Sequence, residues 1–143
     1  MSIGRICCRE VFTATIAERA LVAARRMAAE GVGTLVIVDA SRTPVGVLTD
    51  RDLVVRVLAA GKAPDAVSLA DVMTPAPKVA MEDGPIEAAL RLMRAGGFRR
   101  VPVVDRNGAL VGILSLDDVL ALLAEELTQV GGIVGRQTGV RPA

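Results

Sequence analysis

Two short segments carry the residues whose types and spacing could do chemistry. In each, a hydroxyl residue is followed three positions later by an aspartate: Thr49 with Asp52, and Ser115 with Asp118. A glycine and two aliphatic residues precede each hydroxyl, which predicts a buried strand turning into a helix at that point. A helix N-terminus can bind phosphate through free amides and a hydroxyl, and a short carboxylate one turn later can accept hydrogen bonds from both hydroxyls of a ribose.

The same residues also have a purely structural explanation. Thr49 and Ser115 would cap their helices, and the aspartates at the third position would complete a capping box and complement the helix dipole. A capping box favours the longer Glu or Gln, whereas aspartate occurs twice at the same place. The spacing alone therefore leaves a nucleotide site and a helix cap both open.

The two segments match because the chain is an internal duplication. At a constant offset of 66 residues, as from Asp52 to Asp118, Met27 aligns with Met93, and the same offset pairs Gly31 with Gly97. Duplicated half-size units usually pack about an approximate twofold axis and form two related clefts where they meet. Any function of this chain is thus expected in two copies.

Each unit is predicted to contain a strand, a helix, two strands and a closing helix. The helices that end at Gly31 and Gly97 show apolar faces of helical period, and the aliphatic runs that follow are typical of strands buried on both faces. The closing helices are expected at residues 50–60 and 116–129, with an inward face formed by Leu53, Val54, Val57, Leu58, Val119, Leu120, Leu123 and Leu127. The sequence therefore predicts an α+β fold of two β-α-β-β-α repeats about a pseudo-twofold axis.

The expected boundaries follow from the breakers between these elements. Repeat 1 spans residues 6–60, a linker residues 61–71, repeat 2 residues 72–130, and a flexible tail residues 131–143. The apolar stripe from Leu120 to Val130 runs past what the matching helix of repeat 1 needs. It indicates either additional core or a surface for self-association.

Composition narrows the classes of partner. The 143 residues have a net charge of +1 and only two aromatic residues, Phe12 and Phe98, which argues against a nucleic-acid polymer as partner. Charges interrupt every apolar stretch, so no membrane span is expected, and the N-terminus lacks the pattern of a secretory signal. We expect a cytoplasmic protein in which Cys7 and Cys8 are structural thiols and no metal is bound, since the chain has no histidine.

The whole pattern resembles a pair of cystathionine-β-synthase (CBS) domains. The matching motifs are the sequences DVMTP at 71–75, RRVPVVD at 99–105 and GVLTDRDL at 46–53, and the similarity covers roughly residues 6–127. The resemblance implies two clefts between the repeats that hold an adenine nucleotide (AMP, ADP or ATP) or a related adenosyl ligand such as NADH or S-adenosylmethionine. It implies a regulatory ligand, no required cofactor, and a homodimer in which two pairs form a flat disc.

By the same resemblance, Asp52 and Asp118 would hold ribose, and Thr49 and Ser115 would meet phosphate or the ribose edge. The other residues that the resemblance places at the clefts are Thr13, Thr15, Val36, Arg51, Arg99, Arg100 and Pro102. The chain departs from the family pattern, because Val36 aligns with Pro102, and Val79 and Met81 align with Thr13 and Thr15. The two clefts are therefore expected to bind unequally.

Three functions compete at this point. The first is a ligand-sensing regulatory module, the second a dimerisation or scaffold module with vestigial clefts, and the third a small enzyme. The enzyme has the least support, because the chain has no histidine, no tyrosine, and no pairing of nucleophile and base. The sequence favours a sensor that binds its ligand without transforming it.

Overall fold

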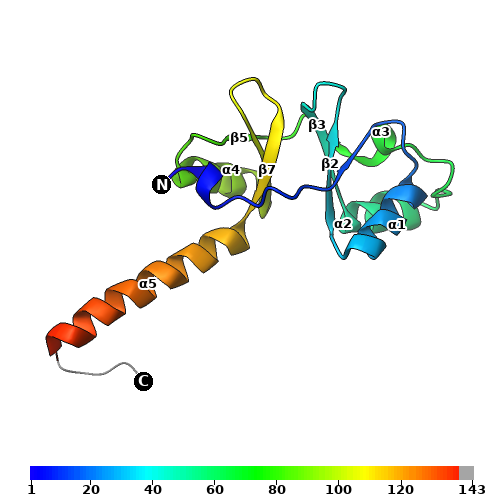
Figure 1. Cartoon of the computed structure of the whole chain (residues 1–143). Coiled ribbons are helices and arrows are strands. Elements are labelled where there is room, and N and C mark those ends of the chain that lie inside the picture. Colours follow the sequence, from blue (N-terminus) through cyan, green and yellow to red (C-terminus); the bar gives the residue numbers. More distant parts are fainter. Residues whose placement is uncertain (139–143) are drawn as a thin grey trace.

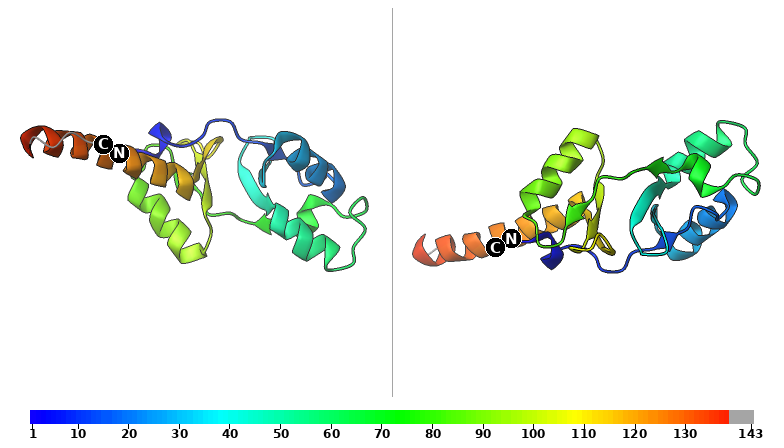
Figure 2. Two further views of the ribbon diagram at one scale, coloured as in Figure 1. Left: turned by 90° about the horizontal axis from the view of Figure 1, so that it is seen from below. Right: turned by 90° about the horizontal axis from the view of Figure 1, so that it is seen from above.

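Two small β-sheets, one from each repeat, stand side by side at the centre of the molecule, with their helices on the outer sides (Figures 1 and 2). The computed structural model describes residues 1–138. The first sheet has the order β1 (Thr13–Ala14), β2 (Thr34–Val38), β3 (Pro44–Thr49) and β4 (Thr74–Pro75). The second has the order β5 (Ala80–Met81), β6 (Arg100–Val104) and β7 (Leu110–Ser115).

The helices follow the predicted order within each repeat. In repeat 1 they are α1 (Ala20–Glu30), α2 (Asp50–Leu53), which continues as one π-helical stretch η2 (Val54–Leu58), and α3 (Leu69–Val72). In repeat 2 they are α4 (Ile86–Gly96) and α5 (Leu116–Thr138), and the short 3-10 helix η1 (Ile3–Arg5), from the segment that leads into repeat 1, packs beside them. The predicted α+β fold of two repeats is confirmed.

The buried strands explain how the repeats meet. Leu35 and Ile37 of β2 belong to the core under the helices of repeat 1. Because side chains alternate along a strand, Val36 lies on the opposite face, toward the other repeat, and it is fully buried. Gly31 and Gly97 end α1 and α4 with φ of 65° and 66°, the left-handed conformation that glycine adopts without steric cost.

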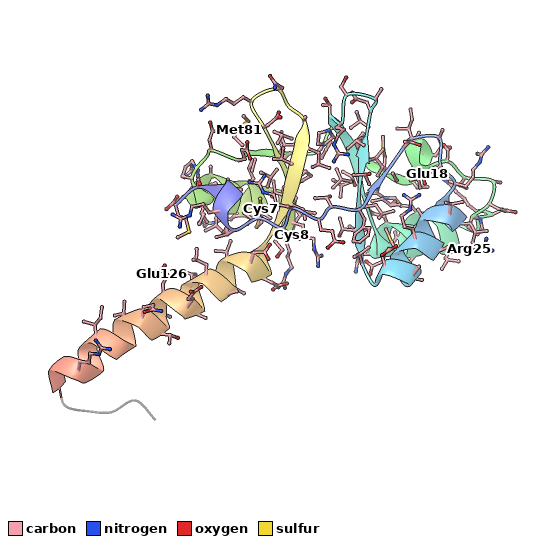
Figure 3. The ribbon with its side chains drawn as sticks, in the orientation of Figure 1. Cys7, Cys8, Glu18, Arg25, Met81 and Glu126 are labelled. Atoms are coloured by element: carbon pink, nitrogen blue, oxygen red, sulfur yellow. The ribbon has the colours of Figure 1, made fainter. Side chains whose placement is uncertain are left out.

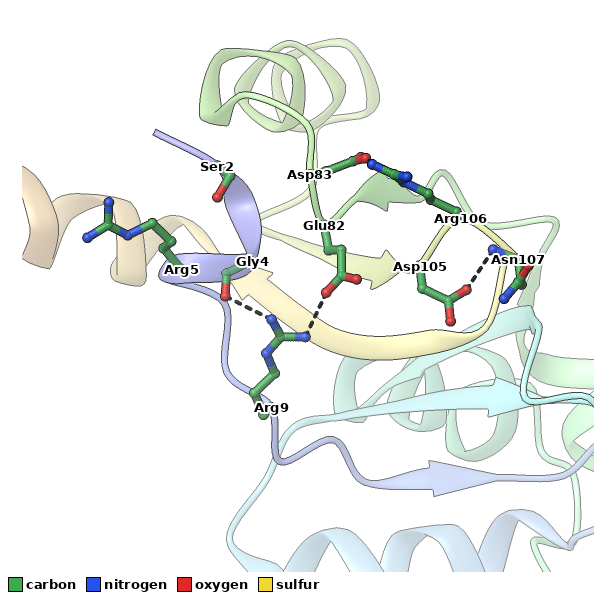
Figure 4. A pocket seen from close by; sticks show the side chains of 9 residues that line it. All are labelled: Ser2, Gly4, Arg5, Arg9, Glu82, Asp83, Asp105, Arg106 and Asn107. Carbon is green, nitrogen blue, oxygen red and sulfur yellow. Dashed lines mark hydrogen bonds and ion pairs between the residues drawn. The ribbon is translucent and has the colours of Figure 1, made fainter.

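The two repeats exchange their leading segments. Ile3 and Cys7 are buried in the core of repeat 2, and their equivalents in the duplication, Leu69 and Met73, pack in the core of repeat 1. Arg9 helps to hold the N-terminal segment on repeat 2. It donates hydrogen bonds to Glu82 at 3.1 Å and to the backbone oxygen of Gly4 at 2.9 Å (Figure 4). The predicted linker of residues 61–71 is therefore partly core, with Leu69 fully buried.

The exchanged segments also extend the two sheets. Thr74 of β4 pairs with Val47 of β3, and at the equivalent place in repeat 2 Cys8 forms a bridge with Ile113 of β7. Figure 3 shows Cys7 and Cys8 beside β7. Each repeat thus receives the strand beside its closing strand from the stretch of chain that leads into the other repeat.

Both closing helices differ from the prediction. In the first, only Val57 is buried, whereas Val54 and Leu58 point to solvent. In the second, Val119 is buried, but Leu120, Leu123 and Leu127 are exposed. The apolar spacing predicts a stripe on each helix but not what covers it, and α5 leaves the sheet after its first turns and projects away from both repeats (Figure 1).

The last helix extends into the segment that the sequence predicts to be a flexible tail. α5 continues through Gly131 and Gly132 to Thr138, despite the low helix propensity of glycine. Residues 139–143 of that predicted tail lie outside the described residues.

Candidate functional site

Two cavities lie between the repeats, and each contains one of the two hydroxyl and aspartate pairs. The first, called here the Asp52 cavity, has a volume of about 410 Å³ and is lined by Thr34, Val47, Thr49, Asp52, Thr74, Ala76, Pro77, Lys78, Phe98, Arg99, Arg100 and Pro102. The second, called the Asp118 cavity, has a volume of about 560 Å³ and is lined by Cys8, Glu10, Val11, Phe12, Glu30, Gly31, Val32, Gly33, Thr34, Arg100, Ile113, Ser115 and Asp118.

The two cavities are equivalent under the duplication. The offset of 66 residues that maps Asp52 onto Asp118 also maps Val47 onto Ile113 and Cys8 onto Thr74. In each cavity the aspartate comes from one repeat, while the leading segment and the start of the central strand come from the other. A ligand in either cavity would therefore contact both repeats at once.

The hydroxyl and aspartate pairs form complete capping boxes. The Thr49 hydroxyl accepts a hydrogen bond from the Asp52 backbone N–H at 3.1 Å, and Asp52 Oδ2 accepts one from the Thr49 N–H at 2.8 Å. Ser115 and Asp118 repeat these bonds at 3.1 and 2.7 Å. The structural explanation from the sequence is thus correct, and aspartate is long enough to close the box.

The capping boxes leave part of each carboxylate facing its cavity. Asp52 Oδ1 lies 3.5 Å from an Arg56 nitrogen, a long ion pair at the cavity edge. Asp118 Oδ1 accepts no hydrogen bond from the residues that the structure describes. Each aspartate can therefore hold its helix through one oxygen and offer the other to a hydroxyl donor such as a ribose.

Six of the remaining predictions divide between lining and non-lining positions. Arg99, Arg100 and Pro102 line the Asp52 cavity, and Arg100 lines the Asp118 cavity as well. Thr13, Thr15 and Arg51 line neither. Thr13 is engaged in the pairing of β1 with β2, the Thr15 backbone N–H donates to Glu18, and Arg51 is exposed on α2.

Val36 also lines neither cavity, although the resemblance to CBS domains placed it at a cleft. It is fully buried between the repeats. Several of the lining residues that the prediction missed come from the leading segments, before β1 and β5. They are Cys8, Glu10, Val11 and Phe12 in one cavity and Thr74, Pro77 and Lys78 in the other.

Both aromatic residues of the chain line cavities, one in each. Phe98 lines the Asp52 cavity and Phe12 the Asp118 cavity, and both are half-buried. An aromatic face of this kind can stack on a nucleobase. The composition could not indicate this arrangement, because a count of two aromatic residues does not show that each of them lines a cavity.

Other features of the surface offer less. A shallow hollow of about 550 Å³ lies on repeat 2 around Glu82 and Arg106, where the charged groups are paired with one another, as Arg106 with Asp83 at 3.1 Å (Figure 4). Among residues 1–138, no three Cys, Asp or Glu side chains gather as a metal site would require. None of the described helices combines the length and apolar character needed to span a membrane.

Comparison with known proteins finds one family over almost the whole chain. The CBS domain family matches twice, at residues 3–59 and 69–125. Protein YlbB of Bacillus subtilis is 36% identical over 119 residues, which cover 82% of this chain and 78% of YlbB. A protein of Methanopyrus kandleri is 39% identical over 120 residues, covering 84% of this chain and 61% of that protein, and a Schizosaccharomyces pombe relative is matched over only 17% of its length.

Solved structures show the same architecture. The CBS domain protein TA0289 of Thermoplasma acidophilum superposes with a TM-score of 0.77 at 26% identity, covering 85% of this chain and 68% of that one. The CBS domain pair of protein MJ0100, solved in complex with 5′-methylthioadenosine and S-adenosyl-L-methionine, has a TM-score of 0.77 at 26% identity and covers 88% and 98%. With both repeats matched by the family and the paired fold present, this chain belongs to the CBS domain family and carries two CBS domains.

Proposed function

We propose that this CBS domain pair binds adenine nucleotides or related adenosyl ligands in its two cavities and works as a non-catalytic regulatory module. The observation that carries the proposal is the pair of equivalent cavities, each with a carboxylate at a helix N-terminus and an aromatic ring. The adenosyl ligands held by the MJ0100 domain pair support it. The protein would act in the cytoplasm, as its sequence indicates.

The lining residues suggest a division of tasks. Asp52 and Asp118 would accept hydrogen bonds from ribose hydroxyls, and Phe98 and Phe12 would stack on adenine. In the Asp52 cavity, the cations Lys78 and Arg100 would meet phosphate. All of these are binding roles, so the ligand would leave unchanged.

Regulation would follow from the way that the cavities are built. Because each cavity draws its lining from both repeats, a bound ligand favours the arrangement of repeats in which the two halves of the lining are correctly spaced. A ligand can shift this arrangement only by its difference in affinity between the two states. The new arrangement of the repeats would then change the activity of a protein partner that contacts the CBS domain pair or its dimer.

Calorimetric titration with AMP, ATP, NADH and S-adenosylmethionine tests the proposal. We expect saturable binding of at least one of the four, and mass spectrometry should recover that ligand chemically unchanged. No heat and no thermal stabilisation with any of them would reject the sensor in favour of a scaffold with vestigial cavities. Turnover of the ligand would reject the non-catalytic assignment.

A second function, dimerisation, is favoured by a separate observation on α5. Leu120, Leu123, Leu127 and Val130 alternate in steps of three and four residues, and each is at least half exposed, Leu127 at 71%. This is the spacing by which two helices pair in a coiled coil. The projecting part of α5, on which Glu126 lies, touches neither repeat (Figure 3). We therefore assign this stripe to α5 of a second copy of the chain.

Sedimentation equilibrium tests this assignment. The native protein is expected to be a dimer, and the double variant Leu123→Glu, Leu127→Glu to be a monomer, because two buried charges would face each other in the seam. Leu58→Glu is the matched control, since Leu58 is an exposed leucine outside α5. Dissociation by Leu58→Glu alone would place the interface on the closing helix of repeat 1 instead.

A further inference from the structure

The linings of the two cavities carry opposite charge. The charged residues of the Asp52 cavity are one carboxylate and three cations, Asp52, Lys78, Arg99 and Arg100. Those of the Asp118 cavity are three carboxylates and one cation, Glu10, Glu30, Asp118 and Arg100. Arg100 lines both, so the difference comes from the other residues.

The two cavities lie at equivalent places in the duplication but differ in charge. At equivalent positions, Lys78 replaces Phe12 and Arg99 replaces Gly33. In the other direction, Glu10 stands where the Asp52 cavity has Ala76. Three independent substitutions thus move the charge of the two linings apart.

Most of these charges are not neutralised by partners within the protein. Arg99 pairs with Asp117 at 3.0 Å, with both side chains about two-thirds exposed, so this pair is weak. Among residues 1–138, no ion pair involves Lys78, Arg100, Glu10 or Glu30. The sign of each lining therefore acts directly on a charged group that enters the cavity.

We propose that the two cavities select adenosyl ligands by the charge of the 5′ substituent. The Asp52 cavity takes a 5′-phosphorylated ligand, and the Asp118 cavity takes one whose 5′ substituent has no phosphate and is neutral or positively charged. This inference rests on the proposed function, since it assumes that adenosyl ligands bind at all. It adds that the pair reads two chemically different ligands rather than one ligand twice.

A thiol already present in the protein can report on one cavity. Cys8 is exposed and lines the Asp118 cavity, whereas Cys7 is buried, and burial raises the pKa of the Cys7 thiol, which keeps it unreactive. The residue equivalent to Cys8 is Thr74, which is exposed and lines the Asp52 cavity. The double variant Cys8→Ser, Thr74→Cys therefore moves the reporter to the other cavity, at the loss of the hydrogen bond that Arg56 donates to the Thr74 hydroxyl at 3.2 Å.

The experiment measures the rate of iodoacetamide alkylation by mass spectrometry, with AMP and with S-adenosylmethionine as probes. At ten times its dissociation constant a ligand should slow the thiol in its own cavity about tenfold. We expect S-adenosylmethionine to protect Cys8 and AMP to leave it reactive. In the double variant, AMP should protect the introduced thiol and S-adenosylmethionine should not.

Charge variants provide the independent check. Lys78→Gln should weaken AMP about tenfold and leave S-adenosylmethionine unchanged, since one phosphate contact is lost. Glu10→Gln should have the opposite selectivity. If both probes bind but protect both thiols alike, or the variants alter both probes equally, charge selection is wrong and the proposed function survives. If neither probe binds the native protein or protects either thiol, both proposals fail.

Discussion

Asp52 and Asp118 each have two tasks in this structure, a helix cap and a cavity wall. The capping bonds of 2.8 and 2.7 Å use one carboxylate oxygen. An alanine at either position removes both tasks at once, so loss of binding in that variant would not distinguish them. The amide of asparagine retains an oxygen for the cap but replaces the second oxygen with a donor, which separates the two tasks.

At the residue scale we therefore predict different outcomes for two substitutions of Asp52. Asp52→Ala should lower the free energy of unfolding by about 1 kcal/mol through loss of the cap and should also abolish ligand binding in the Asp52 cavity. Asp52→Asn should keep most of the stability and weaken binding about tenfold or more, since the ribose loses a charged acceptor. Urea denaturation and calorimetry measure the two quantities. If both variants bind the ligand as tightly as the native protein, Asp52 acts only as a helix cap.

At the scale of elements, two glycines decide how closely each exchanged segment lies on its sheet. A Cβ at Gly46 would meet the Met73 sulfur at 2.2 Å, and a Cβ at Gly112 would meet the Cys7 sulfur at 2.8 Å and the Cys8 backbone oxygen at 2.9 Å. Met73 can rotate its flexible side chain away. The Cys8 carbonyl cannot move in this way, because it accepts the Ile113 N–H at 2.9 Å in the bridge to β7.

We predict that Gly112→Ala destabilises the protein more than Gly46→Ala. The first should lower the free energy of unfolding by about 2–3 kcal/mol, because the segment that carries Cys8 must leave its place on β7, and the second by about 1 kcal/mol. Gly112→Ala should also weaken binding in the Asp118 cavity, which this segment lines. Urea midpoints compare the variants. Equal losses of unfolding free energy would contradict this prediction, because they would mean that both exchanged segments move off their sheets equally easily.

At the scale of the whole molecule, the exchange of leading segments joins the two cores. Ile3 is fully buried in the core of repeat 2, and Leu69 is fully buried in the core of repeat 1. Each core is thus completed by chain that belongs, in sequence order, to the entrance of the other repeat. Neither repeat can open without exposing apolar surface of its neighbour, which predicts one cooperative unfolding transition.

The matched substitutions Ile3→Ala and Leu69→Ala test this coupling. Each should lower the free energy of unfolding by about 2–5 kcal/mol and shift a single transition, even though Ile3 is only the third residue of the chain. Arg5→Ala is the control, because Arg5 lies in the same leading segment as Ile3 but is exposed. It should change the free energy of unfolding by less than about 0.5 kcal/mol. Circular dichroism melts would contradict the coupling if either variant separated the transition into two steps.

The sequence by itself determined the duplication and the order of the main elements, because each depends on local spacing or on an offset visible in the chain. Its motifs carried the resemblance to CBS domains, and its spacing left the capping boxes as one of two explanations. It could not determine the exchange of Ile3 and Leu69 between the cores, the exposure of Leu123 on α5, or the burial of Val36. These depend on which surface covers each apolar face. Helical or strand period reports that a face is apolar, and only the packing of one repeat on the other selects its cover.

The same reason explains which of the predicted residues line the cavities. Thr49, Asp52, Ser115 and Asp118 could be picked out because a helix N-terminus is recognisable from a few adjacent residues, and their roles toward a ligand stay predictions. Lys78, Glu10 and Phe12 line a cavity only because the fold packs each leading segment against the opposite repeat. The opposite charges of the two cavities are spread over distant positions in the chain, and tertiary structure alone gathers them.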